Sequence, residues 1–118
     1  MNPIAAALVA AAAMLAGCAT TAADRKATLV QADPGTMAAL TAGLARAMGK
    51  ASVKLGPGDL TVMSEVAVLP PPLGPHETRS LAEPTIFTLT LRDGACVAIR
   101  QDDGVAHPLP GVRCKPAG

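Results

Sequence analysis

Aromatic residues are almost absent from this sequence. It contains no Trp, no Tyr and one Phe, Phe87. Proteins that bind single-stranded nucleic acid stack bases on aromatic side chains. We therefore expect neither base-stacking platforms nor aromatic sugar-binding clefts, and the core must be built from Leu, Val, Ile, Met and Ala.

An excess of charge of either sign is also missing. The chain has 10 basic and 9 acidic residues, which gives a net charge of +1. This balance is too small to argue for attraction to nucleic acid phosphates or to an anionic membrane surface. We expect no nucleic acid partner.

A hydrophobic run long enough to span a membrane is lacking near the N-terminus. The apolar run covers residues 4–16, which are 13 uncharged residues, nearly all Ala, Leu, Val or Met. At about 1.5 Å per residue such a helix reaches ~20 Å, short of the ~30 Å hydrocarbon core. The length instead suits the apolar region of a secretory signal. A buried Ala-rich helix is the alternative, but the run shows neither caps nor helical period.

The residues that end this run are Leu15-Ala16-Gly17-Cys18. They resemble the lipobox of bacterial lipoproteins, and the resemblance covers only about the first 18 residues of the chain. It implies cleavage before Cys18, diacylglycerol on the Cys18 sulfur and usually a third acyl chain on the new N-terminus. Residues 1–3 carry no Lys or Arg, unlike most secretory signals, so either the α-amino group supplies the charge or the true start lies upstream.

The lipobox resemblance also implies a location. One acyl chain binds membranes marginally, at about 0.8 kcal/mol per buried methylene, and a lipoprotein-type Cys18 carries at least two chains. The next residue is Ala19. In enterobacterial lipoproteins an Asp at that position favours retention in the inner membrane. We therefore expect a lipid anchor in the outer membrane, with the domain facing the periplasm.

Cysteine is rare, and two of the three cysteines remain once Cys18 is set aside. Cys96 and Cys114 form an even pair in a chain expected to reach an oxidising compartment. Their bridge would close a loop of about 19 residues, for which the chain-entropy model gives roughly 3 kcal/mol. A metal site with His107 as third ligand competes, but the sequence has neither a C-x-x-C nor an H-x-x-x-H pair. We predict a disulfide, no metal and no cofactor.

The sequence divides into a signal peptide, residues 1–17, a lipidated tether, residues 18–32, and one small domain, residues 33–118. The tether has mixed polarity and few turn signals, and its end could become helical. The domain is short enough to need an external staple such as the disulfide.

The domain begins with a predicted helix over residues 34–49. Asp33 can cap it, Pro34 suits its first turn, and Gly49 ends it. Apolar residues recur at helical spacing on one face: Met37, Leu40, Leu44 and Met48. Gly43 weakens the helix by about 1 kcal/mol relative to alanine.

After the predicted helix, the pattern of apolar residues changes to one that is typical of β-strands. Residues 51–55 and 60–69 are rich in β-branched residues and flank a turn cluster at 56–59. Asp93-Gly94 predicts a two-residue hairpin turn between residues 85–92 and 95–101. This register pairs Leu91 with Cys96, and a second turn at 102–104 leads to a short edge strand ended by prolines.

We predict an α+β fold with one N-terminal helix packed on an antiparallel sheet of about four strands, held by one disulfide. The proline-rich residues 70–77 interrupt the sheet. They contain a P-x-x-P spacing, which is typical of polyproline ligands, although a stiff connecting loop is the commoner reason for such a stretch.

Few groups of residues in the sequence match a catalytic pattern, and we expect that the protein is not an enzyme. His76, Glu77 and Arg79 make a polar cluster that a solvated loop explains equally well, and no serine lies in a nucleophile-elbow frame. The first functional hypothesis is a structural or protein-binding module of the envelope, which docks on an envelope protein through a sheet edge or the proline-rich loop.

The second hypothesis is a periplasmic inhibitor of a hydrolase or a small-ligand-binding lipoprotein. Membrane-bound lysozyme inhibitors of bacteria are likewise small, disulfide-stapled lipoproteins, and this chain is similar to them only in that outline. Their recognition motifs use a tyrosine, which this sequence lacks.

Overall fold

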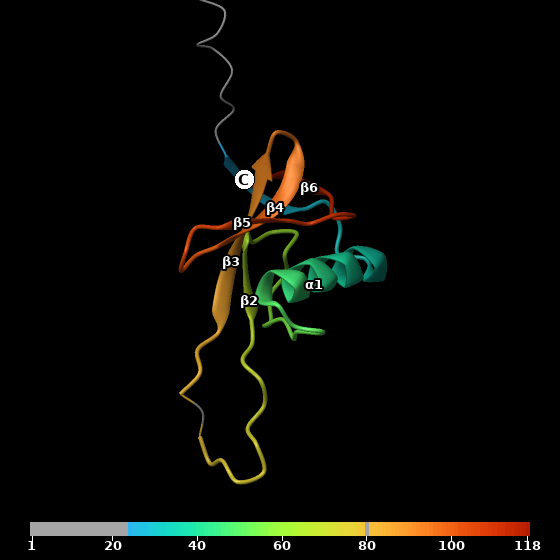
Figure 1. Cartoon of the computed structure of the whole chain (residues 1–118). Coiled ribbons are helices and arrows are strands. Elements are labelled where there is room, and N and C mark those ends of the chain that lie inside the picture. The colour runs from blue at the N-terminus through green and yellow to red at the C-terminus, as the bar shows by residue number, and fades with distance from the viewer. Residues whose placement is uncertain (1–23, 80) are drawn as a thin grey trace, which may run out of the picture.

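The computed structural model describes residues 24–79 and 81–118 (Figure 1). Cys18 and the proposed signal peptide lie outside these residues. The fold is α+β, as predicted, but the antiparallel sheet has six strands and not about four. In chain order the elements are β1 (Arg25–Leu29), α1 (Pro34–Met48), β2 (Glu65–Val68), β3 (Thr85–Arg92), β4 (Ala95–Arg100), β5 (Ala106–Pro108) and β6 (Cys114–Pro116).

Strand β3 organises the sheet. The strand order is β5-β4-β3-β1-β6, and β2 also pairs with β3. Strand β2 pairs with the first half of β3, from Val68 opposite Thr85 onward, whereas β1 pairs near its end, with Arg25 opposite Leu91. Two short strands therefore share the edge of β3 that β4 leaves open.

The β3–β4 hairpin has the predicted turn and register. Asp93 and Gly94 adopt positive φ angles of 52° and 78°, which a two-residue hairpin turn of this kind requires. Leu91 lies opposite Cys96, and Phe87 opposite Arg100. The alternation buries Phe87 completely, so the single aromatic residue sits in the core.

Strand β1 departs from the prediction, because Arg25–Leu29 falls within the range expected to be a tether. The strand lies between β3 and β6, and Ala27 and Leu29 are fully buried. Its first two residues, Arg25 and Lys26, are charged and exposed. These charges interrupt the apolar pattern from which a strand would be predicted. The sheet therefore begins before residue 33, where the domain was predicted to start.

The segment before β2 also differs from the prediction. Of residues 51–55 and 60–69, only Glu65–Val68 forms a strand, and Leu55 makes a single bridge to Val68. Asp59 explains the loss, because its carboxylate accepts hydrogen bonds from the Thr61 N–H (2.9 Å) and hydroxyl (2.6 Å). These bonds hold residues 59–63 in a turn.

Helix α1 confirms the predicted segment. Asp33 caps it by accepting a hydrogen bond from the Thr36 N–H at 3.4 Å, and Gly49 ends it with a φ of 66°. Leu40 and Leu44 are fully buried in the core. Gly43 faces Leu109, and a Cβ built there would lie 2.7 Å from Leu109 Cδ2. The glycine therefore lets the β5–β6 connection pack directly on the helix.

The predicted disulfide joins Cys96 of β4 to Cys114 of β6, with Cα atoms 5.5 Å apart. Strands β3 and β1 lie between them in the sheet order. Three strand spacings of about 4.8 Å would separate the two cysteines by ~14 Å in a flat sheet. The sheet must therefore curl strongly, and Leu109 and Val112, both buried, fill the space under the curl.

Candidate partner-binding surface

Cys96 and Cys114 serve the fold through their disulfide. Cys96 is buried and Cys114 is half-buried, and a shallow groove of about 480 Å³ lies beside them. Apolar side chains such as Val97 and Pro108 line the groove, and Arg113 is the one charged residue among the described residues that line it. This arrangement offers no group that could act as acid, base or nucleophile.

The polar residues considered for catalysis are not brought together. His76, Glu77 and Arg79 are all exposed, and the Glu77 N–H bonds to the Gly74 carbonyl within a local turn (3.1 Å). His107 packs edge-on against Phe87, with ring centroids 6.0 Å apart. Within residues 24–79 and 81–118, no group of three His, Cys, Asp or Glu residues could hold a metal ion.

The described groups whose pKa values are shifted make hydrogen bonds at the surface of the protein. The Arg92 guanidinium donates hydrogen bonds of 2.9 and 2.6 Å to the Asp24 carboxylate, which lowers the pKa of Asp24 and raises that of Arg92. Hydrogen bonds from Thr36 and Thr61 lower the pKa of Asp33 and Asp59. These carboxylates fix the start of β1, the helix cap and a turn.

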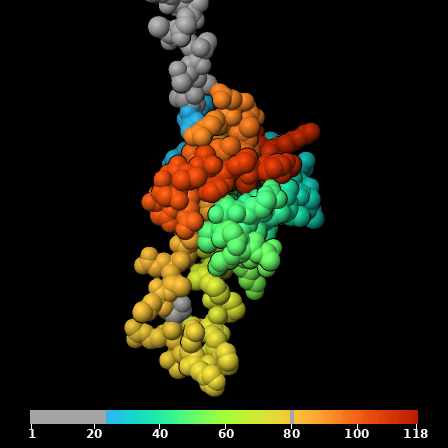
Figure 2. All heavy atoms as spheres, in the orientation of Figure 1, coloured from blue at the N-terminus to red at the C-terminus, as the bar shows by residue number. Residues whose placement is uncertain are grey.

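The most prominent surface feature is the connection between β2 and β3, which we call the arm (residues 69–79 and 81–84). It leaves the sheet after the Val68–Thr85 pair and projects from the body, on the side opposite the start of β1 (Figures 1 and 2). The arm exposes three leucines: Leu69 is 36% exposed, Leu73 46% and Leu81 87%. The arm therefore combines a projecting position with three exposed leucines.

Prolines stiffen the first half of the arm. Five of the chain's prolines lie in the arm: Pro70, Pro71, Pro72, Pro75 and Pro84. Each fixes its own φ and restricts the residue before it. A partner that binds the arm therefore orders fewer backbone angles than a flexible loop would require, which favours affinity.

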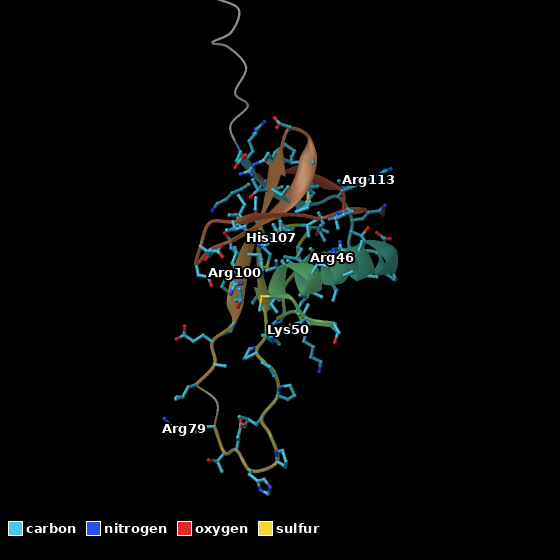
Figure 3. The ribbon with its side chains drawn as sticks, in the orientation of Figure 1. Arg46, Lys50, Arg79, Arg100, His107 and Arg113 are labelled. Atoms are coloured by element: carbon cyan, nitrogen blue, oxygen red, sulfur yellow. A yellow bond between two sulfur atoms is a disulfide. The ribbon has the colours of Figure 1, made fainter. Side chains whose placement is uncertain are left out.

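A small recess lies at the base of the arm. It has a volume of about 260 Å³. Its wall is formed by Leu69 and the three consecutive prolines that follow, and Val53 contributes a half-buried side chain. Lys50, Ser52 and Lys54 supply its polar groups. Figure 3 shows Lys50 just beyond the C-terminal end of α1.

The sheet edges offer less to a partner than the arm does. Strands β5 and β6, which end the sheet order, are three residues long, and each finishes in proline, Pro108 and Pro116. Short edge strands with proline discourage the addition of a further strand. Of the two docking surfaces expected from the sequence, the arm is therefore favoured.

Sequence reasoning identified the proline-rich loop and missed the recess. The lysines of the recess come from the segment after α1, and no pattern in the chain links Lys50 and Lys54 to residues 69–72. The contact arises because the Leu69 N–H bonds to the Lys54 carbonyl at 2.8 Å. Such a long-range backbone bond has no local signal.

No protein-family model, no curated protein and no solved structure matches this chain. In the part that the structure describes, no helix is both long and apolar enough to cross a bilayer. Function must therefore be argued from the arm, the recess and the lipobox resemblance.

Proposed function

We propose that this protein is a lipid-anchored module of the bacterial outer membrane that binds another envelope protein through its arm. The single observation that carries the proposal is the projecting arm with its exposed leucines, the most exposed of which is Leu81. No catalytic step, metal or cofactor is part of the proposed role.

The position of the arm supports this role. Cys18 and Asp24 are six positions apart in the sequence, a length of chain that can span at most about 20 Å. Lipidation of Cys18 would keep the start of β1 near the bilayer. The arm lies on the opposite side of the body (Figure 1), so it would point away from the membrane.

The alternative is an inhibitor of a periplasmic hydrolase. A stiff loop that projects from a disulfide-stapled body also suits insertion into the cleft of an enzyme. Both roles use the same arm, and the identity of the partner separates them: an envelope assembly protein supports the first role, and a hydrolase the second.

A variant with a shortened arm tests the proposal. Residues 69–84 would be replaced by an Asn-Gly turn, which closes the hairpin directly above the Val68–Thr85 pair. We expect wild-type protein to retain one partner from detergent-solubilised envelopes, and the shortened variant to lose it while unfolding with unchanged cooperativity. Retention of the same partner by the shortened variant would contradict a binding role for the arm.

A further inference from the structure

The recess at the base of the arm is lined by two lysines and by no carboxylate of the described residues. Lys50 and Lys54 are exposed, and no ion pair joins either of them to a carboxylate in the described part of the chain. No Asp or Glu is among the residues that line the recess.

Most cations of the described residues, Arg113 and Lys115 among them, lack an ion pair, so Lys50 and Lys54 are distinguished by bordering one apolar recess together. Three other cations have carboxylate partners: Arg92 contacts Asp24, Lys26 contacts Glu65, and Arg100 contacts Asp102. The carbonyl end of α1 attracts cations. A lysine ammonium has three N–H donors, however, so Lys50 and Lys54 can still bind an external acceptor.

The recess is formed before any partner arrives. The Leu69 N–H donates to the Lys54 carbonyl and the Gly56 N–H to the Ala67 carbonyl, each at 2.8 Å. These bonds fix the lysine-bearing segment against the root of the arm. The prolines of the wall hold their own backbone angles. Little backbone entropy is therefore lost when a partner binds this surface.

The size of the recess restricts what can occupy it. Its volume of about 260 Å³ lies below the ~300–1,000 Å³ of sites that enclose small molecules. One or two side chains of a polypeptide fit such a space. An apolar wall with cations at the rim complements a segment that combines an apolar or prolyl residue with a carboxylate.

We infer that the recess binds an acidic segment of the partner polypeptide, with a carboxylate between Lys50 and Lys54 and an apolar side chain against Leu69 and residues 70–72. This inference rests on the proposed function, since it names the chemistry of the partner that the arm engages.

A phage-displayed library of random linear peptides, panned on the oxidised protein, tests the inference. We expect the enriched peptides to carry Asp or Glu beside an apolar residue. Binding of the best peptide should weaken about tenfold or more when both lysines are reversed (Lys50→Glu with Lys54→Glu). It should also weaken as salt rises from about 0.1 to 1 M, because the screening length falls from ~10 to ~3 Å.

The matched control reverses two exposed cations of similar charge elsewhere, Arg113→Glu with Lys115→Glu, and should leave peptide binding unchanged. Three results would overturn the inference. The first is no enrichment of acidic peptides, and the second is equal binding of the peptide by both double variants. The third is binding of the wild type to phosphatidylglycerol vesicles that only the Lys50/Lys54 variant loses, because this result would assign the recess to lipid. A partner that needs the arm but not these lysines would leave the proposed function standing without this inference.

Discussion

Gly43 shows how one missing side chain sets the position of the helix. It lies in the buried face of α1, where glycine costs about 1 kcal/mol relative to alanine. The structure explains the cost, because Leu109 occupies the space that a Cβ would fill. The sequence shows only a weak point in the helix, whereas the structure shows a contact site.

This contact predicts that the effect of Gly43→Ala on the free energy of unfolding changes sign when Leu109 is shortened. Gly43→Ala alone should destabilise the protein by up to about 2 kcal/mol, because overpacking outweighs the gain in helix propensity. In a Leu109→Val background, which removes the clashing Cδ2, Gly43→Ala should instead stabilise by roughly 0.5–1 kcal/mol. Denaturant unfolding measures both values. Stabilisation by Gly43→Ala in the wild-type background would show that Leu109 does not restrict the helix.

Asp33 predicts a dependence of stability on pH. Its pKa in the folded state is lowered from 3.8, chiefly by the hydrogen bond from the Thr36 hydroxyl. The cap therefore contributes above the pKa of the unfolded chain and is lost as pH falls through the lower folded value. Asp33→Asn keeps a capping oxygen but cannot titrate there. Melting curves across this acidic range should decline less steeply for Asp33→Asn, and parallel declines would contradict the assignment.

At the scale of elements, local patterns predicted the helix and the β3–β4 hairpin. Both are specified within a few residues, by Asp33 and Gly49 in one case and by Asp93-Gly94 in the other. Strand β1 and the curl of the sheet depend on pairing between residues far apart in the chain. In addition, the charged residues at the start of β1 obscured the strand pattern in the sequence. The same reasoning applies to the recess, which unites residues 50–54 with 69–72.

The disulfide is the element-scale feature most open to test. Reduction should lower the free energy of unfolding by about 2–4 kcal/mol, since the bridge restricts the unfolded chain and holds β6 against β4. Thermal melts with and without reductant measure the effect. The double variant Cys96→Ala with Cys114→Ala should be insensitive to reductant. Two free thiols in unreduced, unfolded protein, or a dimer that only reductant resolves, would contradict the bridge within one chain.

At the scale of the whole molecule, the start of β1, which follows the proposed lipid anchor in the chain, and the proposed binding arm lie on opposite sides of the body. The body between them is a curled sheet closed by a helix and a disulfide. Its core uses one aromatic residue, and the disulfide supports a domain with little buried aromatic surface. Four of the arm's five prolines lie in residues 70–75, so we expect a partner to meet this first half in a defined orientation.

The anchor makes a separate prediction. Cys18→Ser should leave an unprocessed precursor and remove the mature form from the detergent phase, because no thiol remains to carry diacylglycerol. The folded domain should be unaffected, since β1 begins at Arg25. Normal processing and wild-type partitioning of the variant would show that Cys18 is not the site of lipidation.

Site-specific photo-crosslinking in the cells that make the protein tests the central claim most directly. A photoreactive residue would replace Leu73 or Leu81 in the arm, with controls on the body at Val105 and Val62, whose exposed fractions are similar (46% against 48%, and 87% against 76%). We predict a discrete adduct with one envelope protein from both arm positions and none from the body. An adduct with that protein from Val105 or Val62, or no adduct from either arm position, would contradict the account.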